Sequence, residues 1–488
     1  MASQRVTSQP PQGHSFAANA AFNVLYKVLN VIFPLISSVY LARVLLPAGV
    51  GAVSYAQNVA SYLVLVACLG IPMYGVREIA KRRDSQRDTD TCFSEIIAIN
   101  FCSTTVALLA YAIVVALFFT SDLPLYLVCG LPILFNYISI DWFYQGREDY
   151  VYIAVRSIIV KGLSVLAILL FVHGPQDYVL SAFLTVMGTC GNYLFNIVRA
   201  RRHVHLTLHG LHLRQHLRPI FVLVACSAGA QLYNYVDVLM LGAMDTPEVV
   251  GWYSNAMKAV MVVFTLCTAI SEVFLPRISY LFETDREKVS DLVTLGMQIV
   301  FYFAAPIVMG TVAVAHNLVI VMFGEPFAPA AFTMQLLAPI MIFKGLGDIV
   351  SYQVIIGARQ EGKLVGPYFC ATALNVALNL FLIPLWSLNG AAVASVLTEC
   401  FVNMLLLRHS LRLVRPRVDV RFVAGTVLSA LVMWAAVMAV GTLVHNVFLG
   451  LVLDVVVAVA IYAICGVLGR NPILQMIFGI LKRRLSLS

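Results

Sequence analysis

Long apolar segments, separated by short polar breaks, run along almost the whole chain. Fourteen of them approach or exceed the length of about 20 apolar residues that a helix needs to cross the hydrocarbon core of a bilayer. A transmembrane β-barrel would show alternating segments of about ten residues instead. The pattern therefore predicts an all-α, polytopic membrane protein with about 14 transmembrane helices. The expected spans are residues 17–45, 50–74, 93–119, 123–145, 153–172, 177–198, 219–243, 249–275, 292–315, 332–356, 364–386, 390–408, 422–443 and 448–468.

The composition supports a chain that lies in a membrane. Of the 488 residues, 60% are hydrophobic and 11% are charged, whereas a soluble domain has about 45–50% apolar and about 25% charged residues. A soluble enzyme is therefore excluded. Disorder is also excluded, because so few charges cannot keep such a chain solvated. The 10 cysteines occur without a C-x-x-C pair, so neither a disulfide framework nor a zinc site is expected.

The basic residues predict the orientation of the chain in the membrane. With the N-terminus in the cytoplasm, nearly all of the 32 Lys and Arg residues fall in cytoplasmic segments, as positively charged loops do. Lys161 is counted with these segments, together with Arg147 and Arg156. We therefore expect an even number of spans and two cytoplasmic termini. The net charge of +8 is attributed to this topology and not to nucleic-acid binding.

A repeat with an offset of 200 residues relates the two halves of the chain. Residues 47–56 read P-x-x-V-G-x-x-S-x-A, and residues 247–256 repeat this pattern without a gap. Each copy contains six predicted spans, so the two halves are expected to insert in the same orientation. Two parallel lobes facing a central cavity are typical of a transporter. The predicted domains are an N-terminal six-helix lobe over 16–200, a basic, His-rich cytoplasmic linker over 201–218, a second six-helix lobe over 219–408 and an extra helix pair over 422–468.

Polar side chains recur at helical spacing inside several predicted spans. Asn23, Lys27 and Asn30 are four and three residues apart and therefore share one helix face. Polar groups at membrane depth need a partner or a wet cavity. Single Asn or Ser residues can bond helix to helix, but stripes of this length favour a hydrated path. Lys27 has no acid within four residues, so it is the strongest candidate for binding an anion. The predicted substrate-binding residues are Lys27, Lys258, Lys344, Asn23, Asn30, Asn58, Gln231 and Asn234.

The other charged residues inside the spans leave alternatives open. Lys344 and Asp348 are four residues apart and could neutralise each other on one helix. Asp237 and Lys258 lie at similar distances from the turn between their spans and could also pair. Glu399 has no basic residue within one helical turn. These three acids, Asp237, Asp348 and Glu399, are the predicted ion-coupling residues.

The linker contains histidines at the spacing of a helix. His205, His209, His212 and His216 are four, three and four residues apart. Histidines one turn apart can bind a metal, but no Cys or carboxylate accompanies these. The pattern instead predicts a short basic helix that rests on anionic lipid head groups.

The sequence lacks the motifs of the common enzyme classes. It contains no P-loop, no G-x-S-x-G and no H-E-x-x-H, and its predicted outer loops are short and nearly uncharged. We therefore expect no catalytic residue, no resident cofactor and no metal.

Four motifs are distinctive enough to compare with known families. They are D-W-F-Y-Q-G-R-E-D-Y at 141–150, V-V-G-W-Y-S at 249–254, F-L-P-R-I-S at 274–279 and the segment 324–339. In order and spacing they resemble bacterial O-antigen and capsule repeat-unit flippases of the Wzx type. These flippases form the polysaccharide transporter branch of the multidrug/oligosaccharidyl-lipid/polysaccharide (MOP, MATE-like) exporter superfamily.

This resemblance implies a transporter and not an enzyme. Members of the branch move undecaprenyl-diphosphate-linked oligosaccharide from the cytoplasmic to the outer leaflet of the bacterial cell membrane, for lipopolysaccharide or capsule biosynthesis. They have two six-helix lobes around a cationic, hydrated cavity, and some have two additional helices. The resemblance implies that Lys27 and Lys258 are cavity cations. The expected partners are the lipid-linked oligosaccharide, the lipid bilayer and the polymerase and glycosyltransferases of polysaccharide assembly.

Two other functions compete with this interpretation. A cation-coupled small-molecule or multidrug exporter of the same superfamily would more often have an acidic cavity, whereas three lysines inside the spans favour an anionic cargo. A membrane enzyme of polysaccharide assembly, such as a polymerase or an acyltransferase, would need a catalytic group that the short outer loops lack. Coupling to a H⁺ or Na⁺ gradient is a hypothesis that depends on Asp237, Asp348 and Glu399.

Overall fold

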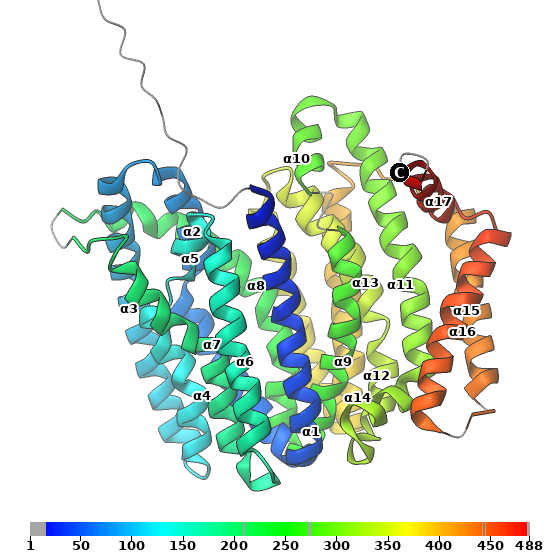
Figure 1. Ribbon diagram of the computed structural model, residues 1–488, viewed down its shortest axis with the longest axis horizontal. Coiled ribbons are helices and arrows are strands. Elements are labelled where there is room, and N and C mark those ends of the chain that lie inside the picture. Colours follow the sequence, from blue (N-terminus) through cyan, green and yellow to red (C-terminus); the bar gives the residue numbers. More distant parts are fainter. Residues whose placement is uncertain (1–15, 208–209, 272–274, 442, 445, 486–488) are drawn as a thin grey trace, which may run out of the picture. The chain divides into compact units, whose positions relative to one another are not determined.

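Every regular element of the described residues is a helix in the computed structural model (Figure 1). The structure describes residues 16–207, 210–271, 275–441, 443–444 and 446–485. Nine stretches of these residues are long and apolar enough to cross a membrane. The predicted all-α, multi-pass membrane fold is therefore confirmed.

The helices follow one another with short connections. The first are α1 Phe16–Cys68, α2 Ile71–Arg82, α3 Gln86–Phe118, α4 Leu123–Phe135, α5 Asp141–Gly146, α6 Tyr150–Phe171 and α7 Tyr178–Ala200. The next are α8 Arg214–Met244, α9 Pro247–Ser271, α10 Leu275–Thr284, α11 Arg286–Phe323, α12 Ala330–Leu337, α13 Ile340–Asp348 and α14 Gly362–Ser410. The last are α15 Val420–Gly441, α16 Val447–Leu468 and α17 Pro472–Leu485. Single-turn 3-10 helices lie at Asn136–Ile138, Pro175–Asp177 and Glu325–Phe327, and a π-helix at Ile349–Ile356 continues α13.

Two of the helices each contain a reversal of the chain. At about 1.5 Å per residue, the 53 residues of α1 and the 49 of α14 would each be more than twice as long as a hydrocarbon core of about 30 Å. The helical backbone is interrupted at Leu46 (φ 61°) in α1 and at Ser387 (φ 51°) in α14. Each helix therefore supplies two spans. With these reversals, each of the fourteen predicted spans is mainly helical over its described residues, with short breaks such as residues 69–70 and 139–140.

The chain forms two compact units. Unit 1 contains residues up to 37, 63–172 and 179–223, and unit 2 contains 38–62, 173–178 and the residues from 224 onward. The division falls inside α1 and α8, and the turn of α1 groups with unit 2. The lobe limits expected at 200 and 219 stay a prediction.

Three helices were not expected from the pattern of spans. These helices, α2, α10 and α17, have 12, 10 and 14 residues, which is too short to cross a bilayer. In unit 1, α2 packs against α3 and α5 (Figure 1). It buries Ile71, Tyr74 and Ile79 and exposes Arg77 and Lys81. Such an alternation of apolar and basic residues is typical of a helix that lies along a membrane surface.

The linker does not form the helix that its histidine spacing predicted. Residues 208 and 209, and with them His209, lie outside the described residues. The described main chain from residue 204 to the start of α8 is non-helical. Side chains of α3 accept its backbone N–H groups. The bonds run from His205 N to Asp90 Oδ1 (3.2 Å), from Thr207 N to Ser94 Oγ (2.9 Å) and from His212 N to Glu95 Oε1 (2.6 Å). The prediction was wrong because these acceptors replace the hydrogen bonds of a helix.

The last histidine of the linker is buried in unit 1. The two ring nitrogens of His216 lie 2.6 Å from Glu95 Oε2 and 2.6 Å from the Tyr74 hydroxyl. Its side chain therefore joins α8 to α2 and α3. This position is incompatible with a histidine that rests on lipid head groups.

The helix pair outside the repeat packs on unit 2. Figure 1 shows α15 and α16 beside α11, and the three helices share an apolar core that includes Phe422 and Met433. The Tyr462 hydroxyl donates to the main-chain carbonyl of Tyr302 at 2.7 Å. The pair is thus attached through α11.

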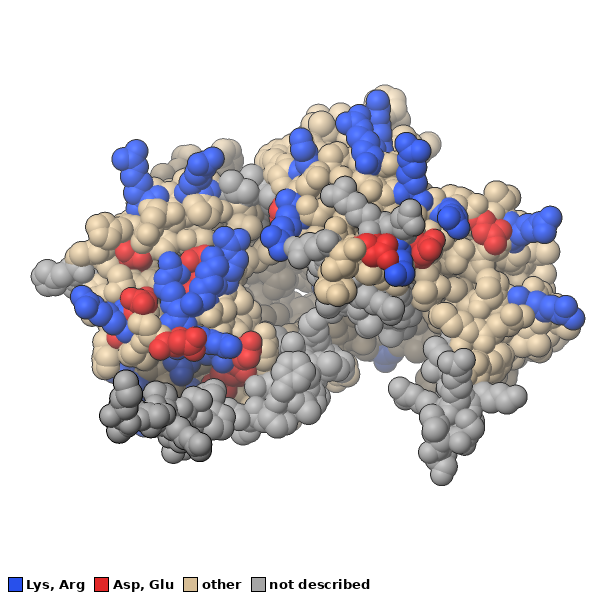
Figure 2. Space-filling view, turned by 90° about the horizontal axis from the view of Figure 1, so that it is seen from above, with Lys and Arg blue, Asp and Glu red and all other residues tan. Residues whose placement is uncertain are grey.

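Figure 2 shows many Lys and Arg side chains, in each unit, at the end of the helices that faces the viewer. In unit 1 the exposed basic residues include Arg77, Lys81, Arg83, Arg87 and Arg201. In unit 2 they include Arg408, Arg412, Arg415, Arg417 and Arg421. This distribution is what the positive-inside rule requires of a cytoplasmic face. The cytoplasmic placement of the termini stays a prediction.

Candidate functional site

The two copies of the repeated motif pack on each other within unit 2. A Cβ atom on Gly51 would lie 2.7 Å from the carbonyl carbon of Pro247 and would overlap its oxygen. A Cβ atom on Gly251 would lie 2.9 Å from the carbonyl carbon of Pro47 and would again overlap the oxygen. Each glycine therefore permits close approach of the other copy's backbone. The contact is reciprocal, as in a twofold interface.

A buried carboxylate, Asp237, lies in the C-terminal third of α8, a few turns before Pro247 in the sequence. Asp237 is 3% exposed. Its Oδ1 accepts from the amides of Asn375 (3.0 Å) and Asn379 (2.7 Å), and its Oδ2 accepts from the Tyr253 hydroxyl (2.8 Å) and from the Ser395 hydroxyl. All four donors are neutral. The ion pair between Asp237 and Lys258, which the sequence left open, is therefore not formed.

The hairpin of α14 assembles most of this carboxylate site. Asn375 and Asn379 are one turn apart before the reversal at Ser387, and Ser395 follows it, so the reversal brings all three to Asp237. The Asn379 Oδ1 atom is buried and has no hydrogen-bond partner among the described residues. Because an amide can turn over and exchange its oxygen and nitrogen, the two asparagines can present oxygens as well as donors. Carboxylate, amide and hydroxyl oxygens suit a hard cation.

A second cluster joins α8, α13 and α14. Lys344 Nζ lies 3.0 Å from Glu399 Oε2, 3.2 Å from Asn234 Oδ1 and 3.4 Å from the Tyr233 hydroxyl. The Asn403 amide also donates to Glu399 Oε1 at 3.2 Å. The basic partner of Glu399 is thus a residue of another helix, α13. The residues next to Glu399 in the sequence did not indicate this partner. Asp348 is half-buried at the end of α13, and its role stays a prediction.

Loss of one partner in this pair is expected to destabilise the protein. Replacing Lys344→Met leaves Glu399 buried without its cation, which costs about 3 kcal/mol. The double variant Lys344→Met/Glu399→Gln is expected to recover most of this loss. Thermal unfolding in detergent measures both effects, with Lys363→Met, an exposed lysine, as the matched control. Additive losses in the double variant would show that the two side chains are not coupled.

The remaining predicted site residues are dispersed. The side chains of Asn23 and Lys27 lie outside the described residues. In unit 2, Asn58 donates to the Ser54 carbonyl of its own helix at 2.8 Å, and Gln231 is exposed. Lys258 is also exposed and has no hydrogen-bond partner among the described residues. The substrate-binding set therefore stays a prediction.

A further membrane lysine was assigned to the wrong place by the sequence analysis. Lys161 was counted with the cytoplasmic segments, but it lies in the middle of α6, and its ammonium donates to Asn30 Oδ1. The assignment failed because the basic residues Arg147 and Arg156 precede it closely. Its mid-span position within residues 153–172 was the available signal. Unit 1 thus contains a half-buried lysine whose bonded partner is neutral.

The most distinctive sequence motif, at 141–150, contributes to structure. Asp141 of α5 forms a 3.1 Å ion pair with Arg156 of α6, which is 5% exposed. Arg156 also donates to Asn192 Oδ1 at 3.1 Å and to Asn196 of α7. The network ties α5, α6 and α7 together. Its buried charge is paired and hydrogen-bonded, as stability at this depth requires.

This helical fold is shared with known transporters. The chain is similar to a structure of the lipid II flippase MurJ in an inward closed conformation, with a TM-score of 0.75 and 14% identity over 93% of this chain and 100% of that one. It is also similar to an inward-facing multidrug resistance MATE family transporter of the MOP superfamily, with a TM-score of 0.62 and 14% identity over 80% of this chain and 97% of that one. The fold of this chain is therefore the one seen in these transporter structures.

Sequence comparison identifies the family. The chain belongs to the polysaccharide biosynthesis protein family, whose model matches residues 16–282. It is 22% identical over 404 residues to the "Putative O-antigen transporter" of Escherichia coli (strain K12), covering 79% of this chain and 95% of that protein. The "Probable low-salt glycan biosynthesis flippase Agl15" of Haloferax volcanii is 23% identical over 189 residues, 38% of this chain and 40% of that protein. The chain is thus a multi-pass membrane flippase of polysaccharide biosynthesis, and not an enzyme.

Proposed function

We propose that this protein moves undecaprenyl-diphosphate-linked oligosaccharide from the cytoplasmic to the outer leaflet of the bacterial cell membrane by alternating access. The observation that carries the proposal is the similarity to the "Putative O-antigen transporter" of Escherichia coli (strain K12) over 95% of that protein's length. The product would supply a surface polysaccharide such as O-antigen or capsule. Polymerase and glycosyltransferases of the same assembly would be its protein partners.

The charges of the spans fit an anionic cargo. A diphosphate cannot cross hydrocarbon unaided, and a lysine in a wet site holds it electrostatically. Lys258 is exposed, and the bonded partner of Lys161 is neutral. Lys344 is already neutralised by Glu399 at 3.0 Å. We therefore rank Lys258 and Lys161 above Lys344 as phosphate-binding residues and retain Lys27 as a candidate from the sequence.

Coupling to an ion gradient is proposed to occur at Asp237. A buried ionised carboxylate without a cation is costly, and Asp237 is surrounded by neutral groups whose oxygens can turn toward a bound Na⁺. A proton on the carboxylate would relieve the same cost. Glu399 is a weaker candidate because Lys344 already balances its charge.

Alternating access requires the repeated motifs to separate. We propose that the contact of Gly51 with Pro247, and of Gly251 with Pro47, closes the predicted outer end of unit 2. It would open when cargo is released.

Reconstitution in proteoliposomes tests the proposed function. A fluorescent undecaprenyl-diphosphate oligosaccharide is placed in both leaflets, and an added lectin reports the molecules that reach the outer surface. We expect the purified chain to accelerate this exposure, and we expect no transport of an organic dye. Dye transport without lipid movement would instead support the multidrug-exporter alternative. If the purified chain moved neither the lipid nor the dye, both functions would be contradicted.

The membrane lysines are expected to control flipping. Lys258→Gln and Lys161→Gln should each lower the flipping rate about tenfold, equivalent to about 1.4 kcal/mol of lost charge interaction. Lys258→Arg should retain most activity because it keeps the charge. The same proteoliposome assay measures these rates, with Lys363→Gln as the exposed control. Wild-type rates in both glutamine variants would remove these lysines from the mechanism.

A further inference from the structure

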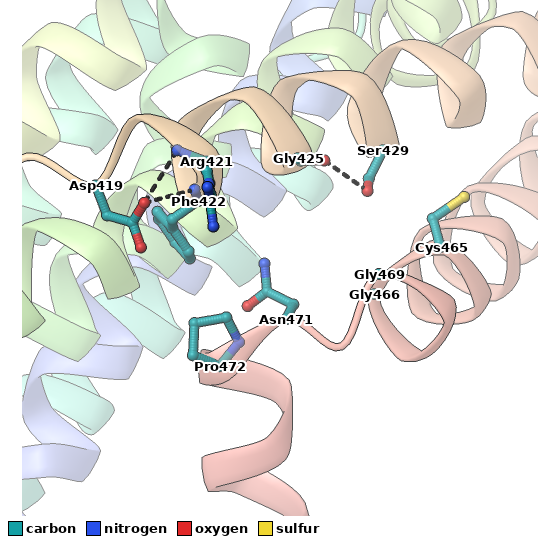
Figure 3. Close-up of a pocket in the computed structure, with 10 residues that line it drawn as sticks. All are labelled: Asp419, Arg421, Phe422, Gly425, Ser429, Cys465, Gly466, Gly469, Asn471 and Pro472. Carbon is teal, nitrogen blue, oxygen red and sulfur yellow. Dashed lines mark hydrogen bonds between the residues drawn. The ribbon is translucent and has the colours of Figure 1, made fainter.

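A cavity of about 180 Å³ lies where one end of the helix pair α15 and α16 meets the start of α17 (Figure 3). None of its lining residues belongs to the Asp237 site or to the Lys344 cluster. The lining residues are Asp419, Arg421, Phe422, Gly425, Ser429, Cys465, Gly466, Gly469, Asn471 and Pro472.

Glycines keep this space open between the two helices. A Cβ atom on Gly425 would meet no atom within 4 Å. A Cβ atom on Gly466, across the cavity, would lie 3.0 Å from Leu474 and 3.1 Å from the Tyr302 hydroxyl. The wall at Gly466 is therefore tightly packed, whereas the space beside Gly425 is vacant. A larger residue at 425 can fill it without displacing a neighbour.

The polar groups of the lining favour an anion. Asp419 Oδ1 accepts the backbone N–H groups of Arg421 (2.9 Å) and Phe422 (3.2 Å), so this carboxylate caps the start of α15 (Figure 3). Asn471 Oδ1 caps the start of α17 by accepting from Ile473 N at 3.0 Å. The starts of two helices thus adjoin the cavity, but both are capped, and the Asp419 carboxylate offsets the positive end of α15. The Arg421 guanidinium and the Asn471 amide nitrogen are therefore the groups of the lining that can hold an anion. No described residue pairs with the Arg421 guanidinium.

The flanking segments place the cavity at the depth of lipid head groups. Residues 408–421 contain several arginines and only one acid, Asp419, and residues 470–484 contain Arg470, Lys482, Arg483 and Arg484 without an acid. Basic clusters of this kind beside a membrane span bind anionic lipids, as do basic pockets between spans. On the same helices, large apolar side chains such as Leu428 and Val459 are 63% and 67% exposed. The apolar surface expected to face lipid therefore adjoins the basic segments near the cavity.

We propose that this cavity binds the head group of an anionic phospholipid. Its phosphate would lie between the Arg421 guanidinium and the Asn471 amide, where charge-assisted hydrogen bonds form. The cavity is too small for a whole phospholipid, so the acyl chains would follow the exposed apolar faces of α15 and α16. Such a lipid would hold the helix pair and α17 in place beside α11.

Lipid binding to the intact protein in detergent tests the proposal. Native mass spectrometry counts bound cardiolipin, phosphatidylglycerol and phosphatidylcholine in separate titrations. We expect wild type to bind the two anionic lipids preferentially, Gly425→Leu to weaken that binding at least tenfold, and Arg421→Gln to remove the preference over phosphatidylcholine. Gly441→Leu, at another position of α15 with open space around it, should bind as wild type does.

Three results would overturn the proposal. One is equal binding of anionic lipid by the Gly425→Leu and Gly441→Leu variants. Another is an unchanged lipid preference in Arg421→Gln, which tests the site even if the leucine variant fails to fold. The third is competition by millimolar inorganic phosphate, because it would mean that the site takes a free anion and not a lipid. The Asp237 variants discussed below report on transport, so their outcome is independent of these results.

Discussion

Replacing Asp237→Asn is expected to uncouple transport from the ion gradient. The amide has almost the same shape as the carboxylate, but it carries no charge and places an NH₂ group against donors from Asn375, Asn379, Tyr253 or Ser395. A cation bound there, as proposed, would lose the charged ligand that Asp237 provides, and a proton would lose its binding site. We expect the gradient-driven flipping rate to fall about 100-fold, which corresponds to about 2.7 kcal/mol.

The measurement compares flipping in proteoliposomes with an imposed Na⁺ gradient, an imposed proton gradient or neither. Asp245→Asn is the matched control, since Asp245 lies at the end of the same region, accepts from the Ser387 hydroxyl and is only half-buried. Wild type should respond to one of the two gradients, which identifies the ion. An Asp237→Asn variant that keeps the full gradient response would exclude the carboxylate from coupling.

Substituting either glycine of the repeated motif is expected to disfavour the proposed closed state of the predicted outer end. In Gly51→Ala and in Gly251→Ala the new methyl group overlaps a carbonyl oxygen of the other copy. Relief of such overlap costs about 1–3 kcal/mol, which shifts a conformational equilibrium by about 5- to 150-fold. We expect flipping to decrease about tenfold and the outer end to become more accessible. The double variant should add little to either single change, because both glycines serve one contact.

Labelling of Val50→Cys by a membrane-impermeant maleimide measures this opening, since Val50 is 6% exposed in the closed contact. Gly366→Ala is a suitable control because a Cβ at Gly366 has open space around it. Unchanged labelling and unchanged flipping in both glycine variants would show that the contact does not act as a gate.

The spans could be predicted because their signal is long and local. A run of about 20 apolar residues needs no knowledge of its neighbours, and the turns at Leu46 and Ser387 follow from the limited thickness of a bilayer. The short helices α2 and α17 fall below that length, so the span pattern did not reveal them. The linker was mispredicted because its hydrogen-bond acceptors belong to α3, more than 100 residues earlier.

The candidate site was only partly predictable for the same reason. Asp237 was noticed because a lone acid in an apolar span is conspicuous. Its partners Asn375 and Asn379 are neutral and 138 and 142 residues away, so nothing in their local sequence linked them to it. The pairing of Lys344 with Glu399 likewise depends on the packing of α13 against α14.

The reciprocal contact of the two motifs also constrains how the chain can evolve. Duplication usually leaves one copy free to accumulate changes while the other keeps the ancestral role. Here Gly51 faces the backbone of residue 247 and Gly251 faces the backbone of residue 47, so a bulkier residue in either half meets the unchanged half. The two halves are therefore expected to drift together at this point, however far apart they diverge elsewhere.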